Sequence, residues 1–289
     1  MGITEKAYGK INLGLDVIGK RDDGYHLVKM IMQNVDIYDT LTFEETKDGT
    51  ITITSGSDKV PCDESNLIYK VAKQLKEKFG ITKGVKIDLD KKIPVAAGMA
   101  GGSADAAATY RALNELWGSG LDEKKLCELA VKLGADIPYC IVGGTALSEG
   151  IGEELTTLKD VPDFSLVVAK PDIDVSTGWV YKELDSSKVE VHPDIDGIRA
   201  SIESGDLTKM CSLIDNVLEK VTRSKYSVIG EIEQILLQNG ALGAYMTGSG
   251  PTVFAIFDDA TKAEEGYRAV RESNLAPECF LTRPINPNR

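Results

Sequence analysis

The sequence has few of the residues that usually bind metals or form disulfides. Only two of its 289 residues are histidines, His26 and His192, and its five cysteines never form a Cys-x-x-Cys pair. Scattered cysteines in odd number are typical of reduced thiols in a cytoplasmic protein. We therefore expect a cytoplasmic protein, without a disulfide framework and without a metal site built from histidine and cysteine.

Long apolar runs are also missing. No run of about 18 apolar residues occurs, so no transmembrane helix is expected. The first residues, Met-Gly-Ile-Thr-Glu-Lys, lack the apolar stretch of a signal peptide. The net charge of −12 argues against nucleic-acid and anionic-membrane partners. It does not exclude ATP, because backbone N–H groups and one or two lysines can bind phosphate within an acidic protein.

What is present is an ordinary globular composition, 42% hydrophobic and 27% charged, with patterns of both strand and helix. Apolar alternation predicts strands at residues 6–19, 27–34, 36–45, 50–54, 85–89, 144–148, 164–169, 243–246, 252–257 and 279–283. Helical periodicity predicts helices at residues 65–79, 104–116, 122–133, 195–203, 206–220, 226–238 and 260–273. Because neither strict alternation of strand and helix nor all-β spacing appears, we predict an α+β fold in two domains, residues 1–155 and 156–289.

Three glycines, Gly98, Gly101 and Gly102, fall within five positions just before a helix-forming run that starts at Ala104. Glycine permits turns that bring N–H groups together, and a helix N-terminus adds unpaired N–H groups and the positive end of the dipole. Such loops typically bind a polyanion, most often phosphate. The spacing matches neither the Walker nor the dinucleotide pattern. From the glycines alone, a flexible turn before an alanine-rich core helix is an equally good interpretation.

The longer motif favours phosphate binding through a resemblance. Residues 94–105 read Pro-Val-Ala-Ala-Gly-Met-Ala-Gly-Gly-Ser-Ala-Asp, which resembles the nucleotide loop of the GHMP kinases, the family of galactokinase, homoserine, mevalonate and phosphomevalonate kinases. It departs from the family where Met99-Ala100 replaces the frequent Leu-Gly. The resemblance implies a two-domain kinase with ATP as phosphoryl donor, Mg²⁺ expected with it, and the active site in the cleft between domains. The residues implied in ATP binding are Asn66, Pro94, Gly98, Met99, Ala100, Gly101, Gly102, Ser103, Ala104 and Asp105.

The N-terminal segment carries a second part of the resemblance. It contains Lys10-Ile-Asn12-Leu and, after a turn, Asp-Gly-Tyr25-His26. Without context these residues would be the solvated face of a strand and a surface turn. Together they resemble a GHMP branch whose acceptor is a cytidine-diphosphate-linked polyol. The resemblance implies that Lys10 is catalytic, that Asn12 binds substrate, and that Tyr25 and His26 hold the cytosine by stacking and hydrogen bonding.

Asp136 stands directly before Ile-Pro138 in the segment Gly134-Ala-Asp-Ile-Pro. Because a residue before proline is held extended, away from the helical region, the segment before Pro138 predicts that Asp136 is presented at a helix end rather than along a helix face. An ordinary turn carboxylate is the plain interpretation. In the resembled family this aspartate is the catalytic base, with Lys10 as its partner.

Further substrate residues are implied by the same resemblance. Thr177 and Tyr181 lie in a segment where the family has a threonine and an aromatic residue, although Trp179 competes for the aromatic role. Gly248, Ser249 and Gly250 resemble the third glycine motif, which can also be a tight turn between strands. Asn66, assigned to ATP above, is equally well placed to cap the helix that follows it.

The resemblance implies ATP-dependent phosphorylation of the 2-hydroxyl of 4-diphosphocytidyl-2-C-methyl-D-erythritol, a step of non-mevalonate isoprenoid precursor biosynthesis. Another GHMP kinase, of the homoserine or mevalonate type, and a nucleotide-binding module without catalysis are the alternatives. The Asp-Gly-Tyr-His segment speaks against the first, and the presence of both Lys10 and Asp136 speaks against the second.

Overall fold

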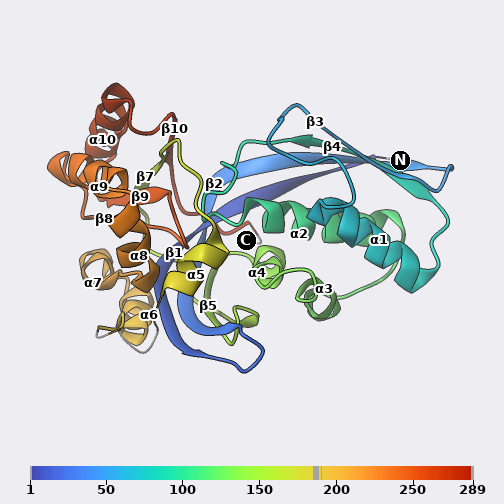
Figure 1. Cartoon of the computed structure of the whole chain (residues 1–289), viewed down its shortest axis with the longest axis horizontal. Coiled ribbons are helices and arrows are strands. Elements are labelled where there is room, and N and C mark those ends of the chain that lie inside the picture. Colours follow the sequence, from blue (N-terminus) through green and yellow to red (C-terminus); the bar gives the residue numbers. More distant parts are fainter. Residues whose placement is uncertain (1, 185–188, 190, 288–289) are drawn as a thin grey trace. The chain divides into compact units, whose positions relative to one another are not determined.

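The computed structural model describes residues 2–184, 189 and 191–287 and has a mixed helix and strand fold (Figure 1). Its internal contacts divide the chain into two compact units that interleave along the sequence. Unit 1 comprises Met1–Gly9, Ile37–Val95 and Ala100–Val142, and unit 2 comprises Lys10–Asp36, Ala96–Met99 and Gly143–Arg289. The predicted division after residue 155 stays a prediction. Among the described residues, no helix is long and apolar enough to cross a membrane.

The two longest strands, β1 (Gly2–Lys20) and β2 (His26–Thr46), pair with each other and contribute residues to both units. The predicted apolar positions of β1, such as Ile11 and Leu13, are fully buried. The polar positions between them are not a solvated face, because Lys10 is only 4% exposed and Asn12 only 2%. Burying such groups is costly without hydrogen bonds, so both side chains require partners inside the protein.

Unit 1 packs helices against strands. Strand β4 (Gly84–Asp90) pairs antiparallel with residues 40–46 of β2 and parallel with β3 (Ile51–Ser55). The helices are α1 (Leu67–Phe79), α2 (Gly101–Leu116), α3 (Glu123–Ala130) and α4 (Ile137–Val142). Helix α2 lies beside α1 and α4, and α1 also contacts β3 (Figure 1). The small buried side chains of Ala104, Ala106, Ala107 and Ala108 allow α2 to approach its neighbours closely.

Unit 2 contains a second, fully antiparallel sheet in the order β10-β7-β9-β8. Its strands are β7 (Ser165–Lys170), β8 (Gly243–Met246), β9 (Val253–Phe257) and β10 (Glu278–Thr282). Helices α9 (Val228–Gln238) and α10 (Ala260–Ser273) pack against this sheet (Figure 1). Unit 2 also contains β5 (Thr145–Glu149), which pairs with residues 30–33 of β2 and with β6 (Glu154–Thr157).

The remaining helices of unit 2 are α5 (Thr177–Glu183), α6 (Ile195–Ser204), α7 (Leu207–Leu213) and α8 (Val217–Lys225). The prediction of one helix over residues 206–220 is wrong, because the chain leaves the helical conformation between α7 and α8. There, Asp215 O accepts a hydrogen bond from Leu15 N of β1 at 3.0 Å, and Asn216 caps α8. Helices α4 and α5 and strand β6 were not predicted, since each is short and carries little periodic signal.

Candidate active site

Hydrogen bonds of its side chain and its backbone hold Lys10 at the glycine loop. Its ammonium group donates to Asn12 Oδ1 at 2.6 Å and to Gly98 O at 2.8 Å, and its backbone N donates to Met99 O at 3.1 Å. Hydrogen bonds of a charged donor are among the stronger ones in proteins. The predicted catalytic lysine therefore lies, buried and oriented, at the first residues of the predicted phosphate loop.

The third glycine motif reaches the same place in unit 2. Thr247 Oγ1 accepts from Asn12 N at 3.0 Å and donates to Asn12 Oδ1 at 3.2 Å. Gly248 has a φ of 58°, and a Cβ added to it would lie 2.9 Å from Gly98 O and 3.4 Å from Lys10 Nζ. Only a glycine fits this approach, so residues 98 and 248 bring the two glycine motifs together beside Lys10.

The loop that leads into α2 takes several turns with positive φ. Ala96, Gly98 and Ala100 have φ values of 52°, 70° and 56°. Such values are uncommon for alanine and indicate local strain, which persists only where the surroundings enforce it. Ala100 is the N-cap of α2 and has no side chain that could cap the helix. The N–H groups of residues 101–103 lie in the first turn of the helix, where backbone N–H groups have no partner within the helix. Such unpaired N–H groups favour the binding of an anion.

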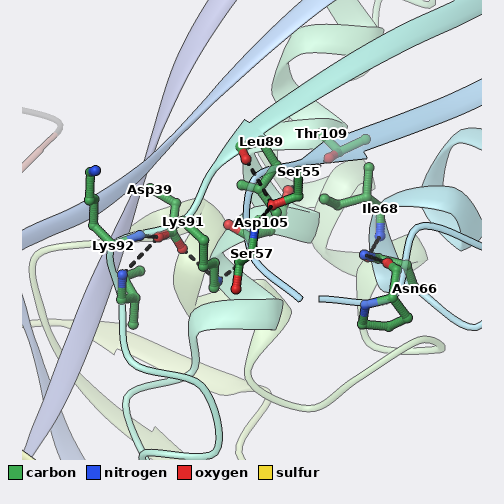
Figure 2. A network of polar contacts seen from close by, with 12 residues as sticks. Asp39, Ser55, Ser57, Asn66, Ile68, Leu89, Lys91, Lys92, Asp105 and Thr109 are labelled. Atoms are coloured by element: carbon green, nitrogen blue, oxygen red, sulfur yellow. Dashed lines mark hydrogen bonds and ion pairs between the residues drawn. The ribbon is translucent and has the colours of Figure 1, made fainter. Parts of the chain in front are cut away.

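A buried ion network lies behind this helix start in unit 1, and Figure 2 shows it from close by. Lys91 Nζ lies 2.6 Å from Asp39 Oδ2 and 2.7 Å from Asp105 Oδ2. Asp39 Oδ1 also accepts from Lys92 N at 2.6 Å and from Ile93 N at 2.8 Å. Sequence patterns gave no signal for Lys91 or Asp39, because they pair over more than 50 positions of the chain.

Electrostatics in this network are unbalanced, since one lysine faces two carboxylates. Burial would lower the pKa of Lys91, but the charges of Asp105 and Asp39 outweigh it and raise that pKa. Burial raises the pKa of the Asp105 carboxyl to about 8, although Lys91 acts in the opposite direction. Among the described residues, Asp105 Oδ1 has no hydrogen-bond partner. The side chain of Asp105 thus faces Lys91, and its predicted contact with ATP stays a prediction.

The other residues predicted to bind ATP have ordinary structural positions. Asn66 caps α1, with Oδ1 accepting from Ile68 N at 2.9 Å and Nδ2 donating to Pro61 O at 2.6 Å (Figure 2). Its capping interpretation is confirmed, and its role with the nucleotide stays a prediction. Pro94, Met99 and Ala104 are buried around the loop.

Two of the residues predicted to bind the cytosine lie in contact in unit 2. The rings of His26 and Tyr181 have centroids 5.0 Å apart. Partial burial, and after it the charge of Lys20, lower the pKa of His26, so its ring is neutral near pH 7. Tyr25, at the turn before β2, is 58% exposed and available to a ligand.

Trp179, the competing aromatic residue, is engaged elsewhere. Its ring lies under the ammonium of Lys225, 4.3 Å from ring centroid to nitrogen, and packs edge-on against Tyr226. On the same helix, α5, Thr177 Oγ1 lies 2.9 Å from Ser249 Oγ of the third glycine motif. The geometry favours Tyr181 over Trp179 as the partner of His26.

Asp136 directly precedes α4 in unit 1 and is half-buried. Its backbone O accepts from Cys140 N at 3.1 Å, as expected at a helix start. Pro138 occupies the first turn of α4, where its missing N–H group costs nothing. Asp136 thus lies at a helix start, and its role as catalytic base stays a prediction.

No ready-made metal site accompanies these residues. In the described part of the chain, no three histidine, cysteine, aspartate or glutamate side chains are grouped so that they could hold a metal ion. Mg²⁺ usually needs only one or two carboxylates besides the phosphates of its nucleotide. We therefore assign no residue to Mg²⁺.

Comparison with known proteins shows which family this chain resembles. The descriptions "GHMP kinases N terminal domain" and "GHMP kinases C terminal" match residues 66–144 and 198–275. Curated relatives from Clostridium botulinum (strain Eklund 17B / Type B) and Lachnoclostridium phytofermentans are 48% and 49% identical to this chain. Each alignment covers 97% of this chain, with 99% and 97% of the respective relative, and both relatives are named 4-diphosphocytidyl-2-C-methyl-D-erythritol kinase.

Solved structures agree with this result. A crystal structure of 4-(cytidine 5'-diphospho)-2C-methyl-D-erythritol kinase is 28% identical, with a TM-score of 0.83 over 98% of this chain and 99% of that one. A homoserine kinase from Cytophaga hutchinsonii has a TM-score of 0.77 at 20% identity, over 98% of this chain and 95% of that one, which shows the shared fold alone. The predicted α+β fold and the family resemblance are confirmed, and the chain belongs to the GHMP kinase family.

Proposed function

We propose that this protein is an ATP-dependent kinase that phosphorylates the 2-hydroxyl of 4-diphosphocytidyl-2-C-methyl-D-erythritol, in non-mevalonate isoprenoid precursor biosynthesis. The observation that carries the proposal is the buried ammonium of Lys10, hydrogen-bonded to Gly98 O and adjacent to Gly248. The curated relatives, which are named for this activity and match over nearly their full length, support the choice of acceptor. The scattered cysteines support a cytoplasmic location.

On the donor side, we assign the triphosphate of ATP to the loop of residues 98–105. The uncapped start of α2 and the positive φ values before it support this assignment, because they direct N–H groups toward one place. Phosphoryl transfer depends mainly on positioning and on stabilising the charge of the transferring group. Lys10 supplies a positive charge for that purpose, and Mg²⁺ is expected to enter with ATP.

On the acceptor side, we assign the cytosine to Tyr25, His26 and Tyr181. A neutral imidazole can donate one hydrogen bond and accept another, which suits the hydrogen-bonding edge of a pyrimidine. The contact between His26 and Tyr181 supports the choice of Tyr181, rather than Trp179, beside His26. Asn12, Thr177 and residues 248–250 are assigned to the rest of the acceptor.

The chemical step needs a base for the acceptor hydroxyl, and we assign this role to Asp136. Its carboxylate accepts the hydroxyl proton as the oxygen forms a bond to the γ-phosphorus. The bond from the γ-phosphorus to the bridging oxygen breaks, and ADP leaves. Presentation of Asp136 at the start of α4 supports this role.

The experiment that tests the proposal is an ADP-release assay with a panel of acceptors. The panel contains 4-diphosphocytidyl-2-C-methyl-D-erythritol, homoserine and mevalonate. We expect acceptor-dependent ADP release with the first compound only. Release with homoserine or mevalonate instead would contradict the proposal, and nucleotide binding without release would indicate a module without catalysis.

A further inference from the structure

One face of helix α8 is turned toward the third glycine motif, residues 247–251. Asn216 is the N-cap of this helix, and Glu219 and Thr222, which are three residues apart, share one side of it. Glu219 accepts a hydrogen bond from Met246 N at 3.0 Å, and Thr222 Oγ1 donates to Ser249 O at 3.1 Å. Helix α8 is therefore bonded to the backbone both before the loop and within it.

Asn216 uses its whole side-chain amide in this arrangement. Nδ2 donates to Met246 O at 2.9 Å and to Gly248 O at 2.8 Å, while Oδ1 accepts from Leu218 N at 3.0 Å. The residue is 3% exposed. A primary amide has two N–H donors and a carbonyl acceptor, so one side chain caps the helix and holds the loop at the same time.

The loop needs such support because of its glycines. Gly248 and Gly250 have φ values of 58° and 80°, and glycine has the largest conformational freedom of all residues. Inside the loop, Gly250 N donates to Thr247 O at 2.9 Å. The carbonyl groups of Met246, Gly248 and Ser249 are fixed from outside, by Asn216 and Thr222.

The other contacts of the loop lead to Lys10. Thr247 Oγ1 bonds both the backbone N and the side-chain Oδ1 of Asn12, and Asn12 Oδ1 accepts from Lys10 Nζ. Asn216 is thus connected to Lys10 through the loop and Asn12, entirely within unit 2.

We propose that Asn216 is a positioning residue for phosphoryl transfer: it fixes the loop of residues 247–251 and, through Thr247 and Asn12, the place of the Lys10 ammonium. This inference rests on the proposed function. Asn216 touches no reacting atom in this account, and its effect on the reaction passes through Lys10. A loss of Asn216 should therefore affect the chemical step more than nucleotide affinity.

The substitution Asn216→Asp separates the two tasks of the side chain. Aspartate caps a helix as well as asparagine does, so the start of α8 is kept. It has no N–H donors, however, and sets a carboxylate against the carbonyl oxygens of Met246 and Gly248. Thr222→Val is a second, independent variant, because it removes the bond to Ser249 O without touching the helix cap.

Two measurements are made on the full-length protein. The first is steady-state kinetics with ATP and the acceptor, in which we expect Asn216→Asp to lower kcat by about 10- to 100-fold, as small misplacements of catalytic groups do. We expect the KM for ATP to change far less. The second is hydrogen exchange of the backbone amides of residues 247–250 and of Thr252. This measurement needs no activity, and the exchange should be faster in the variant.

Asp206→Asn is the matched control. Asp206 caps the neighbouring helix α7 by accepting from Lys209 N at 2.9 Å, so the control makes the reverse change at another helix start. We expect its kcat and its loop exchange to match those of the wild type.

The outcomes distinguish this inference from the proposed function. If the wild type is active and both Asn216→Asp and Thr222→Val keep its kcat and its loop exchange, the inference is overturned. It is also overturned if kcat of Asn216→Asp falls only as much as the fraction of folded protein falls, as measured by thermal unfolding. If the wild type phosphorylates no acceptor, the proposed function fails. Unchanged hydrogen exchange in the variants would in that case still overturn the proposal that Asn216 fixes the loop of residues 247–251.

Discussion

The ammonium of Lys91 lies 2.7 Å from a carboxylate oxygen of Asp105, and both side chains are more than nine-tenths buried. The ammonium of Lys91 also pairs with Asp39, so its positive charge only partly offsets the cost of burying a charged Asp105. Burial therefore raises the pKa of Asp105 to about 8, and the carboxyl group is mostly protonated at neutral pH in the folded protein.

This arrangement makes stability depend on pH. The ordinary pKa of an aspartate is 3.8, so between about pH 4 and pH 8 the folded protein keeps a proton that the unfolded chain has lost. The contribution of Asp105 to the free energy of unfolding consequently falls as the pH rises through this window. Asp105→Asn removes this titrating group, so the melting temperature of the variant minus that of the wild type should increase with pH. Thermal unfolding at several pH values across the window tests this expectation. A difference between the two melting temperatures that stays constant with pH would contradict it.

Gly101→Val should weaken ATP binding severely while the protein remains folded. A Cβ at this position would lie 3.0 Å from Lys91 Nζ and 3.0 Å from Ile93 Cγ2, so the larger side chain crowds the start of α2. At Gly102 the nearest atom would be 3.9 Å away, and Gly102→Ala should weaken ATP binding less. Calorimetric titration with ATP measures both affinities, and an unchanged Kd in folded Gly101→Val would contradict the placement of the triphosphate.

Asp136→Asn should lower kcat strongly, because the amide cannot accept the hydroxyl proton. Removing a positioned general base typically costs about 100- to 10,000-fold in rate. The affinity for ATP should hardly change, since the substitution is nearly isosteric. Near-full kcat in the variant would mean that Asp136 is an ordinary residue of a helix start.

The cytosine clamp predicts selective losses for the acceptor. Base–aromatic stacking is worth about 1–3 kcal/mol per base, so Tyr25→Ala and Tyr181→Ala should each raise the acceptor KM by about one to two orders of magnitude. The KM for ATP should stay near the wild-type value. Trp179→Ala is the control, because Trp179 contacts Lys225 and Tyr226, and it should affect the acceptor KM less. Equal losses for both substrates would indicate that the tyrosines are structural.

Local sequence signals predicted much of the fold and part of the site. Glycine spacing, alternation and helix periodicity depend on neighbouring residues, and the elements that they predict, such as α10 at residues 260–273, are present. Local signals alone left Lys10 on a solvated strand face and residues 247–251 in a plain turn. The family resemblance, carried by compact motifs, was needed to assign them to the site.

Contacts between distant segments could not be predicted from one sequence. Thr247 pairs with Asn12 across 235 positions, and neither residue carries a pattern that points to the other. Asn216 was missed for a related reason, because the apolar periodicity of residues 206–220 continues across the break between α7 and α8. The hydrogen bonds of Asn216 with Leu218, Met246 and Gly248, together with the bond from Leu15 N to Asp215 O, accompany the break between the two helices.

The central claim, transfer of the γ-phosphoryl group to one hydroxyl of a cytidine-diphosphate-linked polyol, is tested most directly by ³¹P NMR of the reaction mixture. With ATP, Mg²⁺ and 4-diphosphocytidyl-2-C-methyl-D-erythritol, we predict a new phosphomonoester signal that grows as the γ-phosphate signal of ATP declines. The diphosphate signals of the acceptor should persist. In a proton–phosphorus correlation spectrum the new group should lack a three-bond coupling to a carbinol proton, because the carbon of the 2-hydroxyl bears no proton. Loss of the γ-phosphate signal to free inorganic phosphate alone, or no change with this acceptor and a phosphomonoester with homoserine or mevalonate, would contradict the account.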